Sequence, residues 1–180
     1  MPQKQVYSTM VALVSGDITR SPLEAIVTDS NPDLKAGRGP NNAIHTAAGP
    51  ALATECKQSF DHDGPCEAGQ VRITGAGMLR AKYVIHAVSP KWQGGMGLEE
   101  RILGDTYQAA LKAAADYGLS SVALTLLGIG DYSRYPVDKA ATVGIYAVEE
   151  FCRADERLRE IQFIISDQFV YSMVNKAMTY

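Results

Sequence analysis

The chain has 180 residues, of which 46% are hydrophobic and 21% are charged, which is the composition of an ordinary globular domain. Its formal net charge of -3 argues against a strongly basic surface for nucleic acid. Cys56, Cys66 and Cys152 lack metal-like spacing, and their odd number favours free thiols in a reducing compartment. No cleavage-site pattern or membrane-length apolar segment is present. We therefore expect one soluble intracellular domain, residues 1–180, that binds neither nucleic acid nor membrane directly.

Apolar runs and helical spacing alternate along the whole chain. Short apolar or alternating segments predict strands at 10–14, 25–28, 70–74, 83–88, 122–127 and 161–165. Apolar residues at i, i+3 and i+4 predict helices at 43–48, 51–60, 98–117, 137–152 and 169–177. This alternation predicts an α/β domain with helices on both faces of a mostly parallel sheet.

Two glycine-rich loops each lead into a predicted helix. The first is GRGP at 37–40, where Asn41 or Asn42 is expected to cap the helix. The second is GIGD at 128–131, which follows the predicted strand 122–127. Glycine lets backbone amides approach an anion closely, and a helix N-terminus adds unpaired N–H groups. Two such loops in one small domain predict a diphosphate-type ligand.

The loops that follow the strands of a parallel sheet meet at its carboxyl edge. We expect this edge to bring together Asp17, the two glycine loops, Ser166 and Asp167. Asp17 taken alone also fits a plainer interpretation, in which its side chain only caps the following turn.

Three other features suggest chemistry but have a plainer explanation. Asp61, His62 and Asp63 precede a glycine–proline pair, which predicts a solvated turn rather than a metal site. His45 and His86 lie in apolar segments, and we expect buried histidines with hydrogen bonds there rather than catalysts. We predict no metal ligand and no catalytic residue.

Five segments resemble, in order and spacing, the macro domain family: VALVSGDIT, IVTDSN, GRGPNNAIHTAAG, AKYVIHAVSP and LGIGDYSRYPVDKAA. The resemblance implies a three-layer α/β/α sandwich with a central, mostly parallel mixed sheet. It also implies ADP-ribose or a close relative as the ligand, a link to NAD metabolism, and no cofactor.

The same resemblance implies roles for particular residues. Asp17 would bind the adenine amino group beside the Ile18 backbone, and the two glycine loops would enclose the diphosphate and the distal ribose. Ser166 lies where the family often has an aromatic that stacks on adenine, and Phe169 is the alternative for that role. The residues expected at the ligand are Asp17, Ile18, Asn31, Gly37, Arg38, Gly39, Pro40, Gly128, Ile129, Gly130, Asp131, Tyr132 and Ser166.

Within the family, the chain is most similar to the macro domain of the macro histone variants. The similar parts are AKYVIHAVSPKW, the spacing of the LGIG loop and the ending FIISDQFVYSMVNKAM. This narrower resemblance implies a nuclear module with ADP-ribosylated proteins or poly-ADP-ribose ends as partners. It would reach chromatin through a histone portion outside this chain, and the cytoplasm is the alternative location.

Two departures from the family pattern bear on catalysis. Many macro domains have Asn-Ala-Ala-Asn after the second strand, whereas TDSN at 28–31 keeps only Asn31. The hydrolase branch has an aspartate where this chain has Asn41, and an amide cannot accept a proton from water. We therefore expect a binding module without hydrolase activity. The alternatives are a hydrolase that removes ADP-ribose from proteins or metabolites, and a scaffold with no ligand.

Overall fold

The computed structural model describes all 180 residues and contains one mixed sheet of seven strands. The sheet order is β1-β2-β7-β6-β3-β5-β4. The strands are β1 (Gln3–Val6), β2 (Thr9–Ser15), β3 (Ala25–Asp29), β4 (Val71–Gly75), β5 (Tyr83–Ala87), β6 (Ser121–Leu124) and β7 (Glu160–Ile165). The five inner strands are parallel, and the edge strands β1 and β4 are antiparallel to their neighbours.

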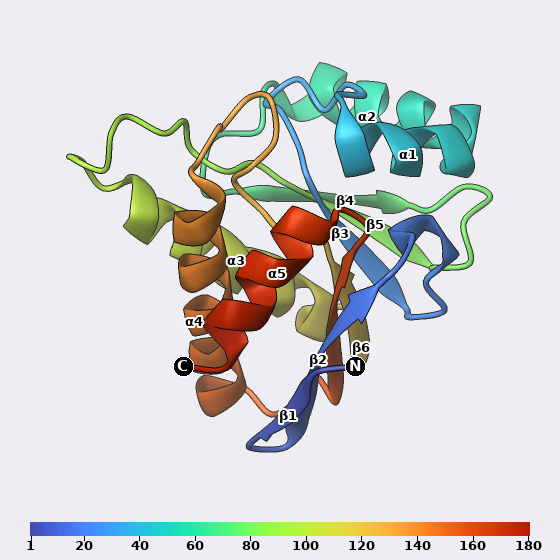
Figure 1. The fold of residues 1–180 in the computed structure, drawn as a ribbon. Coiled ribbons are helices and arrows are strands. Elements are labelled where there is room, and N and C mark those ends of the chain that lie inside the picture. The colour runs from blue at the N-terminus through green and yellow to red at the C-terminus, as the bar shows by residue number, and fades with distance from the viewer.

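Helices cover both faces of this sheet (Figure 1). They are the short 3-10 helix η1 (Ile18–Arg20), α1 (Gly39–Ala48), α2 (Pro50–Asp63), α3 (Glu99–Asp116), α4 (Val137–Ala154) and α5 (Gln168–Met178). The smaller core cluster packs α1 and α2 on one face, and the larger cluster packs α3, α4 and α5 on the other. The predicted three-layer α/β/α sandwich is therefore confirmed. No helix is both long enough and apolar enough to cross a membrane.

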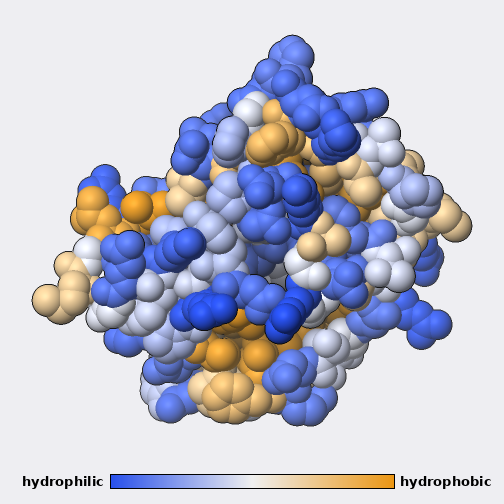
Figure 2. All heavy atoms as spheres, turned by 90° about the horizontal axis from the view of Figure 1, so that it is seen from above, coloured by the Kyte–Doolittle hydropathy of each residue, from blue (hydrophilic) through white to orange (hydrophobic).

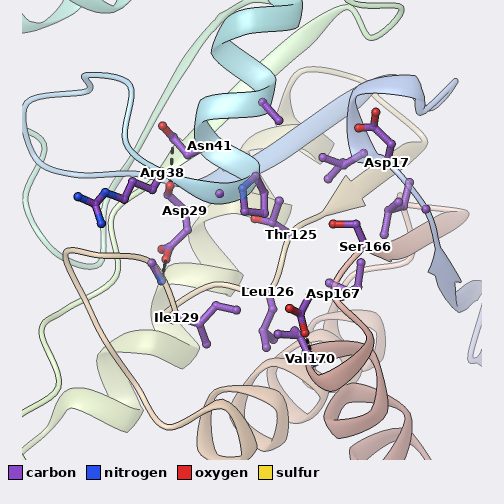
Figure 3. Close-up of a pocket in the computed structure, with 18 of the residues that line it drawn as sticks. Asp17, Asp29, Arg38, Asn41, Thr125, Leu126, Ile129, Ser166, Asp167 and Val170 are labelled. Carbon is purple, nitrogen blue, oxygen red and sulfur yellow. Dashed lines mark hydrogen bonds between the residues drawn. The ribbon is translucent and has the colours of Figure 1, made fainter.

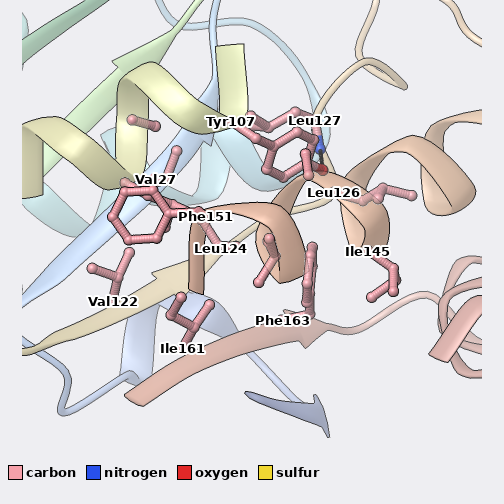
Figure 4. Close-up of a cluster of buried hydrophobic side chains, with 14 of the residues drawn as sticks. Val27, Tyr107, Val122, Leu124, Leu126, Leu127, Ile145, Phe151, Ile161 and Phe163 are labelled. Carbon is pink, nitrogen blue, oxygen red and sulfur yellow. Dashed lines mark hydrogen bonds between the residues drawn. The ribbon is translucent and has the colours of Figure 1, made fainter. Parts of the chain in front are cut away.

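The larger core cluster holds the start of the second glycine loop in place. Tyr107 of α3 is fully buried beside Phe163 of β7, with ring centroids 6.3 Å apart (Figure 4). Its hydroxyl accepts a hydrogen bond from the Leu127 N–H at 2.9 Å. A Cβ atom at Gly144 of α4 would lie 2.7 Å from the same hydroxyl. Glycine at 144 thus lets α4 approach α3 closely enough for Tyr107 to reach the loop.

Several element boundaries differ from those predicted. Strand β1 was not expected, and the strand predicted at 122–127 ends at Leu124. Helix α1 begins at Gly39, so neither Asn41 nor Asn42 is its cap; the N-cap is Arg38, without a side-chain hydrogen bond. The solvated turn expected at 61–63 is instead the exposed last turn of α2, which ends at Asp63 and is capped by Gly64 with φ of 75°.

Candidate functional site

A cavity of about 720 Å³ lies at the carboxyl edge of the parallel strands, a size typical of small-ligand sites. Four segments line it: the turn after β2, the end of β3 with the start of α1, the loop after β6, and the end of β7 with the start of α5. Seen from above, the molecule is hollowed near its middle, and hydrophobic atoms gather on one side (Figure 2). The structure therefore brings together the loops that the sequence places at this edge.

One end of the cavity is formed by Asp17, Ser166 and Asp167 (Figure 3). Asp17 Oδ1 caps η1, because it accepts hydrogen bonds from the Thr19 N–H at 2.9 Å and the Thr19 hydroxyl at 2.7 Å. Asp17 thus caps the turn as expected, and it also lines the cavity, so its predicted contact with a ligand stays a prediction. Asp167 has the same task in α5, where its Oδ1 accepts the Val170 N–H at 2.9 Å.

Arg38, Asn41 and Asp29 lie at the opposite end (Figure 3). Asn41 is buried, and its Oδ1 accepts the Gly37 N–H at 2.7 Å. Its Nδ2 donates to the Asp29 carbonyl oxygen at 3.1 Å. Both ends of this amide are therefore occupied in joining the first glycine loop to the end of β3.

The carboxylate of Asp29 is bound by the second glycine loop. Its Oδ2 accepts the Gly128 N–H at 3.1 Å and the Gly130 N–H at 3.0 Å, while Oδ1 accepts the Ser89 hydroxyl at 2.9 Å. These two amides already bind an anion of the protein, so a diphosphate enclosed by this loop, which stays a prediction, would have to use its other N–H groups. A carboxylate and a phosphate oxygen satisfy the same kind of donor, so the loop has the predicted affinity for anions but an internal partner.

Other amide groups at this end remain available to a ligand. The N–H groups of Ile129, Asp131 and Tyr132 donate no hydrogen bond within the protein. The first turn of α1 adds N–H groups without intrahelical acceptors, together with the positive end of the helix dipole. Arg38 and Asp131 join the two loops through an exposed ion pair of 3.4 Å. This end of the cavity is thus suited to an anionic ligand.

Burial raises the pKa of Asp29 from 3.8 to about 6, and the hydrogen bonds from Ser89, Gly130 and Gly128 only partly oppose this. No cation pairs with the carboxylate. Asp29 therefore titrates close to neutral pH, which is the range in which a carboxylate can both accept and release a proton during a reaction.

Nine of the thirteen residues expected at the ligand line the cavity: Asp17, Ile18, Arg38, Gly39, Pro40, Ile129, Gly130, Asp131 and Ser166. Asn31, Gly37, Gly128 and Tyr132 do not. Their role in ligand contact stays a prediction for all thirteen. Asp167, which was expected at this edge of the sheet but not among the ligand contacts, also lines the cavity. The remaining wall residues were not among the expected ligand contacts; they are Gly16, Asp29, Asn41, Ala43, Thr125, Leu126, Ile164, Ile165 and Val170.

The four residues off the wall have local structural tasks. Asn31 closes a turn, because its side chain bonds the backbone N–H and carbonyl of Lys35. The Tyr132 ring lies under the Lys91 ammonium at 4.9 Å. Phe169, the alternative for stacking on adenine, is 61% exposed and lies off the cavity wall. A signal for Asp29 was available, because this acidic residue directly follows the predicted strand 25–28.

His45, Cys56 and His86 form a buried cluster outside the cavity wall, with one candidate ligand atom each within 4.8 Å of one another. His86 Nε2 lies 2.9 Å from the Thr74 hydroxyl, and burial lowers its pKa to about 3. Burial also raises the pKa of the Cys56 thiol to about 11. Both histidines are buried as predicted, and both are neutral at physiological pH. His45 Nε2 and His86 Nδ1 have no hydrogen-bond partner, so the predicted hydrogen bonding holds for His86 only.

Fold and site together define an α/β/α domain that holds an anion-binding cavity at the carboxyl edge of its sheet. The family model described as Macro domain matches residues 27–144. The chain belongs to the macro domain family.

Relatives of known name and structure cover nearly the whole chain. It is 37% identical over 161 residues to the O-acetyl-ADP-ribose deacetylase of Cronobacter sakazakii, with 89% of each chain covered. The Oceanobacillus iheyensis macrodomain with ADP has a TM-score of 0.92 and 27% identity, covering 99% of this chain and 95% of that one. The Trypanosoma brucei macrodomain in complex with ADP-ribose has a TM-score of 0.82 and 28% identity, covering 92% and 68%. None of the three is named as a histone variant.

Proposed function

We propose that this macro domain binds ADP-ribose in the cavity and hydrolyses the acetyl ester of O-acetyl-ADP-ribose. The observation that carries the proposal is the 37% identity to an O-acetyl-ADP-ribose deacetylase over 89% of both chains. The proposal replaces the expectation of a purely binding, chromatin-associated module, which none of the relatives described above supports.

The two ends of the cavity suit the two ends of this ligand. At one end, Asp17 keeps its Oδ2 free of hydrogen bonds within the protein, so that oxygen can accept from the adenine amino group. At the other end lie the unpaired amides of Ile129 and Asp131, which can donate to phosphate and ribose oxygens. This polarity directs the distal ribose, with its acetyl group, toward Asp29 and Asn41.

The diphosphate carries negative charge that the cavity has to offset. The N-terminus of α1 and the Arg38 guanidinium supply positive potential at the same end. The carboxylates of Asp29 and Asp131 work against it. We therefore expect binding through many backbone amides rather than through strong pairing with cations.

Turnover and binding are measured separately. Purified protein is incubated with O-acetyl-ADP-ribose, and released acetate is followed by NMR; we expect turnover well above the uncatalysed background. Calorimetry with ADP-ribose and ADP measures binding. ADP lacks the distal ribose and loses several hydrogen bonds, each worth about 0.5–1.5 kcal/mol. Its affinity should therefore be at least about tenfold weaker than that of ADP-ribose. Saturation by ADP-ribose without acetate release would contradict the deacetylase activity and leave the binding function in place.

A second candidate is a module that binds ADP-ribosylated proteins without catalysis. The observation that favours it is Asn41, which stands where the resembling hydrolases have an aspartate and uses both ends of its amide for structure. In that case the wild type would be inactive on mono-ADP-ribosylated protein, although it would bind it. A histone portion and a nuclear location stay predictions that depend on this second candidate.

A further inference from the structure

Four carboxylates line the cavity, and three of them belong to exposed residues. Asp17 and Asp167 cap η1 and α5 at the end of the cavity assigned to adenine. Asp131 is exposed and pairs with Arg38 at 3.4 Å. Asp29 alone is held inside the protein without a cation, at the end assigned to the distal ribose. Hydrolysis of an ester at that end needs a group that takes a proton from water, and Asn41 cannot do so.

We propose that Asp29 is the catalytic base of this cavity. Position 41, where the resembling hydrolases have an aspartate, cannot take this role because it is an asparagine here. The inference rests on the proposed deacetylase activity and names the residue that would perform it. Asp29 and Asn41 are neighbours, because the Asn41 amide donates to the Asp29 carbonyl oxygen at 3.1 Å. The proposed base therefore lies at the end of β3, beside the place on α1 where the resembling hydrolases have an aspartate.

The proposed step balances without any added reagent. Asp29 accepts a proton from a water molecule. At the same time the oxygen of that water attacks the acetyl carbonyl carbon, and a new C–O bond forms. The tetrahedral intermediate then collapses, and the bond between the acetyl carbon and the ribose oxygen breaks. Asp29 returns the proton to that ribose oxygen, which leaves as a hydroxyl. The products are ADP-ribose and acetic acid, which ionises in water.

The surroundings of Asp29 keep the carboxylate fixed but able to accept a proton. Its hydrogen bonds come from Ser89, Gly128 and Gly130, so neither oxygen can rotate away. The titratable and charged groups around it are Tyr107 from α3, Tyr135 from the loop before α4, and Arg38 and Asp131 on the cavity wall. Burial raises the pKa of both tyrosines, so they stay neutral, and the pair Arg38–Asp131 is neutral overall. A pKa of about 6 for Asp29 leaves it ionised at neutral pH and still basic enough to act.

Asp29→Asn is the decisive variant, because it removes the proton acceptor and keeps the shape. The new carbonyl oxygen can accept both glycine amides, and the new amide can donate to the Ser89 hydroxyl, which then acts as acceptor. We expect kcat for O-acetyl-ADP-ribose to fall about 10²–10⁴-fold, while the Kd for ADP-ribose changes less than about threefold. Asp105→Asn, at an exposed aspartate of α3, is the matched control and should keep wild-type kcat.

The outcomes separate this role from the proposed function. Wild-type turnover that survives in Asp29→Asn overturns the role of Asp29 and leaves the deacetylase activity standing. Loss of turnover in Asp131→Asn but not in Asp29→Asn assigns the base to Asp131 instead. A loss of ADP-ribose affinity that matches the loss of kcat shows a positioning role and also overturns the proposal. A wild type without turnover overturns the proposed function itself.

The pH profile gives a readout that needs no variant. Wild-type kcat should fall about tenfold for each pH unit below about 6, because protonated Asp29 cannot act as a base. If Asp29→Asn does not fold, this profile decides: a limb near pH 6 supports Asp29, and a constant kcat between pH 5 and 7 overturns it.

Discussion

Asn41 holds the Gly37 N–H at 2.7 Å, so a side chain inside helix α1 fixes the conformation of the loop that precedes it. The other end of the same amide donates to Asp29 O at 3.1 Å, to Thr28 Oγ1 at 3.3 Å and to Ser30 Oγ at 3.5 Å. An asparagine suits this place because it is donor and acceptor at once.

Asn41→Asp is therefore expected to destabilise the fold. Aspartate keeps the acceptor for Gly37 but turns a second oxygen toward the carbonyl oxygen of Asp29, where a donor is needed. The free energy of unfolding, measured by urea denaturation, should decrease by about 1–3 kcal/mol. Asn42→Asp, at an exposed neighbour on the same helix, should stay within about 0.5 kcal/mol of wild type. Equal stability of the two variants would show that the Asn41 amide is not needed as a donor.

Position 130 requires glycine because the Asp29 carboxylate lies close to it. A Cβ atom there would lie 2.9 Å from Asp29 Oδ2, which is closer than non-bonded atoms approach. Gly130→Ala should lower the free energy of unfolding by about 1–3 kcal/mol. The same change in an Asp29→Ala background should cost much less, and a double-mutant cycle measures the difference. Gly16→Ala, whose Cβ would meet nothing within 4 Å, is the control. Additive effects would mean that Asp29 is not the obstacle.

Arg38→Ala should separate binding from stability. The ion pair with Asp131 is exposed, with the Arg38 side chain 88% accessible, so its loss should change the unfolding free energy by less than about 1 kcal/mol. The same loss removes a positive charge from the end of the cavity assigned to the diphosphate. Calorimetry should show ADP-ribose affinity about 2–5-fold weaker, with a smaller effect at high salt. Asp131→Asn removes a negative charge instead and should shift affinity the other way; a shift in the same direction would contradict this electrostatic account.

Asp29 should make the protein less stable as the pH rises toward neutrality. Its pKa in the folded state is about 6, above the ordinary 3.8, so the folded state binds the proton more tightly than the unfolded state. The free energy of unfolding therefore loses about 3 kcal/mol as the pH increases from about 4 to about 6 and beyond.

The difference between wild type and Asp29→Asn isolates this effect. His86, whose pKa is lowered to about 3, has the opposite influence on stability in the same range, but it is common to both proteins. Urea denaturation at pH 4.5 and pH 7.5 should show that Asp29→Asn gains stability relative to wild type at the higher pH. An unchanged difference would contradict a raised pKa for Asp29.

The fold and the edge of the sheet that carries the site could be predicted from periodicity. The inner strands are apolar runs such as AIVT at 25–28 and VALTLL at 122–127, and amphipathic helices separate most of them. Boundaries were less predictable. Strand β1 is QKQV, a mostly polar edge strand without a clear apolar pattern. The run after Leu124 resembles a strand but leaves the sheet: the Thr125 N–H still bonds the Val27 carbonyl of β3, whereas the Leu127 N–H bonds Tyr107 of α3 instead.

Residue patterns alone predict that two glycine loops, with backbone amides able to bind an anion, would stand at one edge of a parallel sheet. Glycine, proline and apolar runs act on their immediate neighbours, so their effect can be predicted from adjacent residues. Which anion the amides of the second loop bind depends on contacts between distant parts of the chain. Asp29 reaches Gly128 and Gly130 across 99 and 101 residues of chain, because β3 and β6 pair side by side in the sheet. The same burial that brings them together removes water from the carboxylate and raises its pKa, and no local pattern encodes that environment.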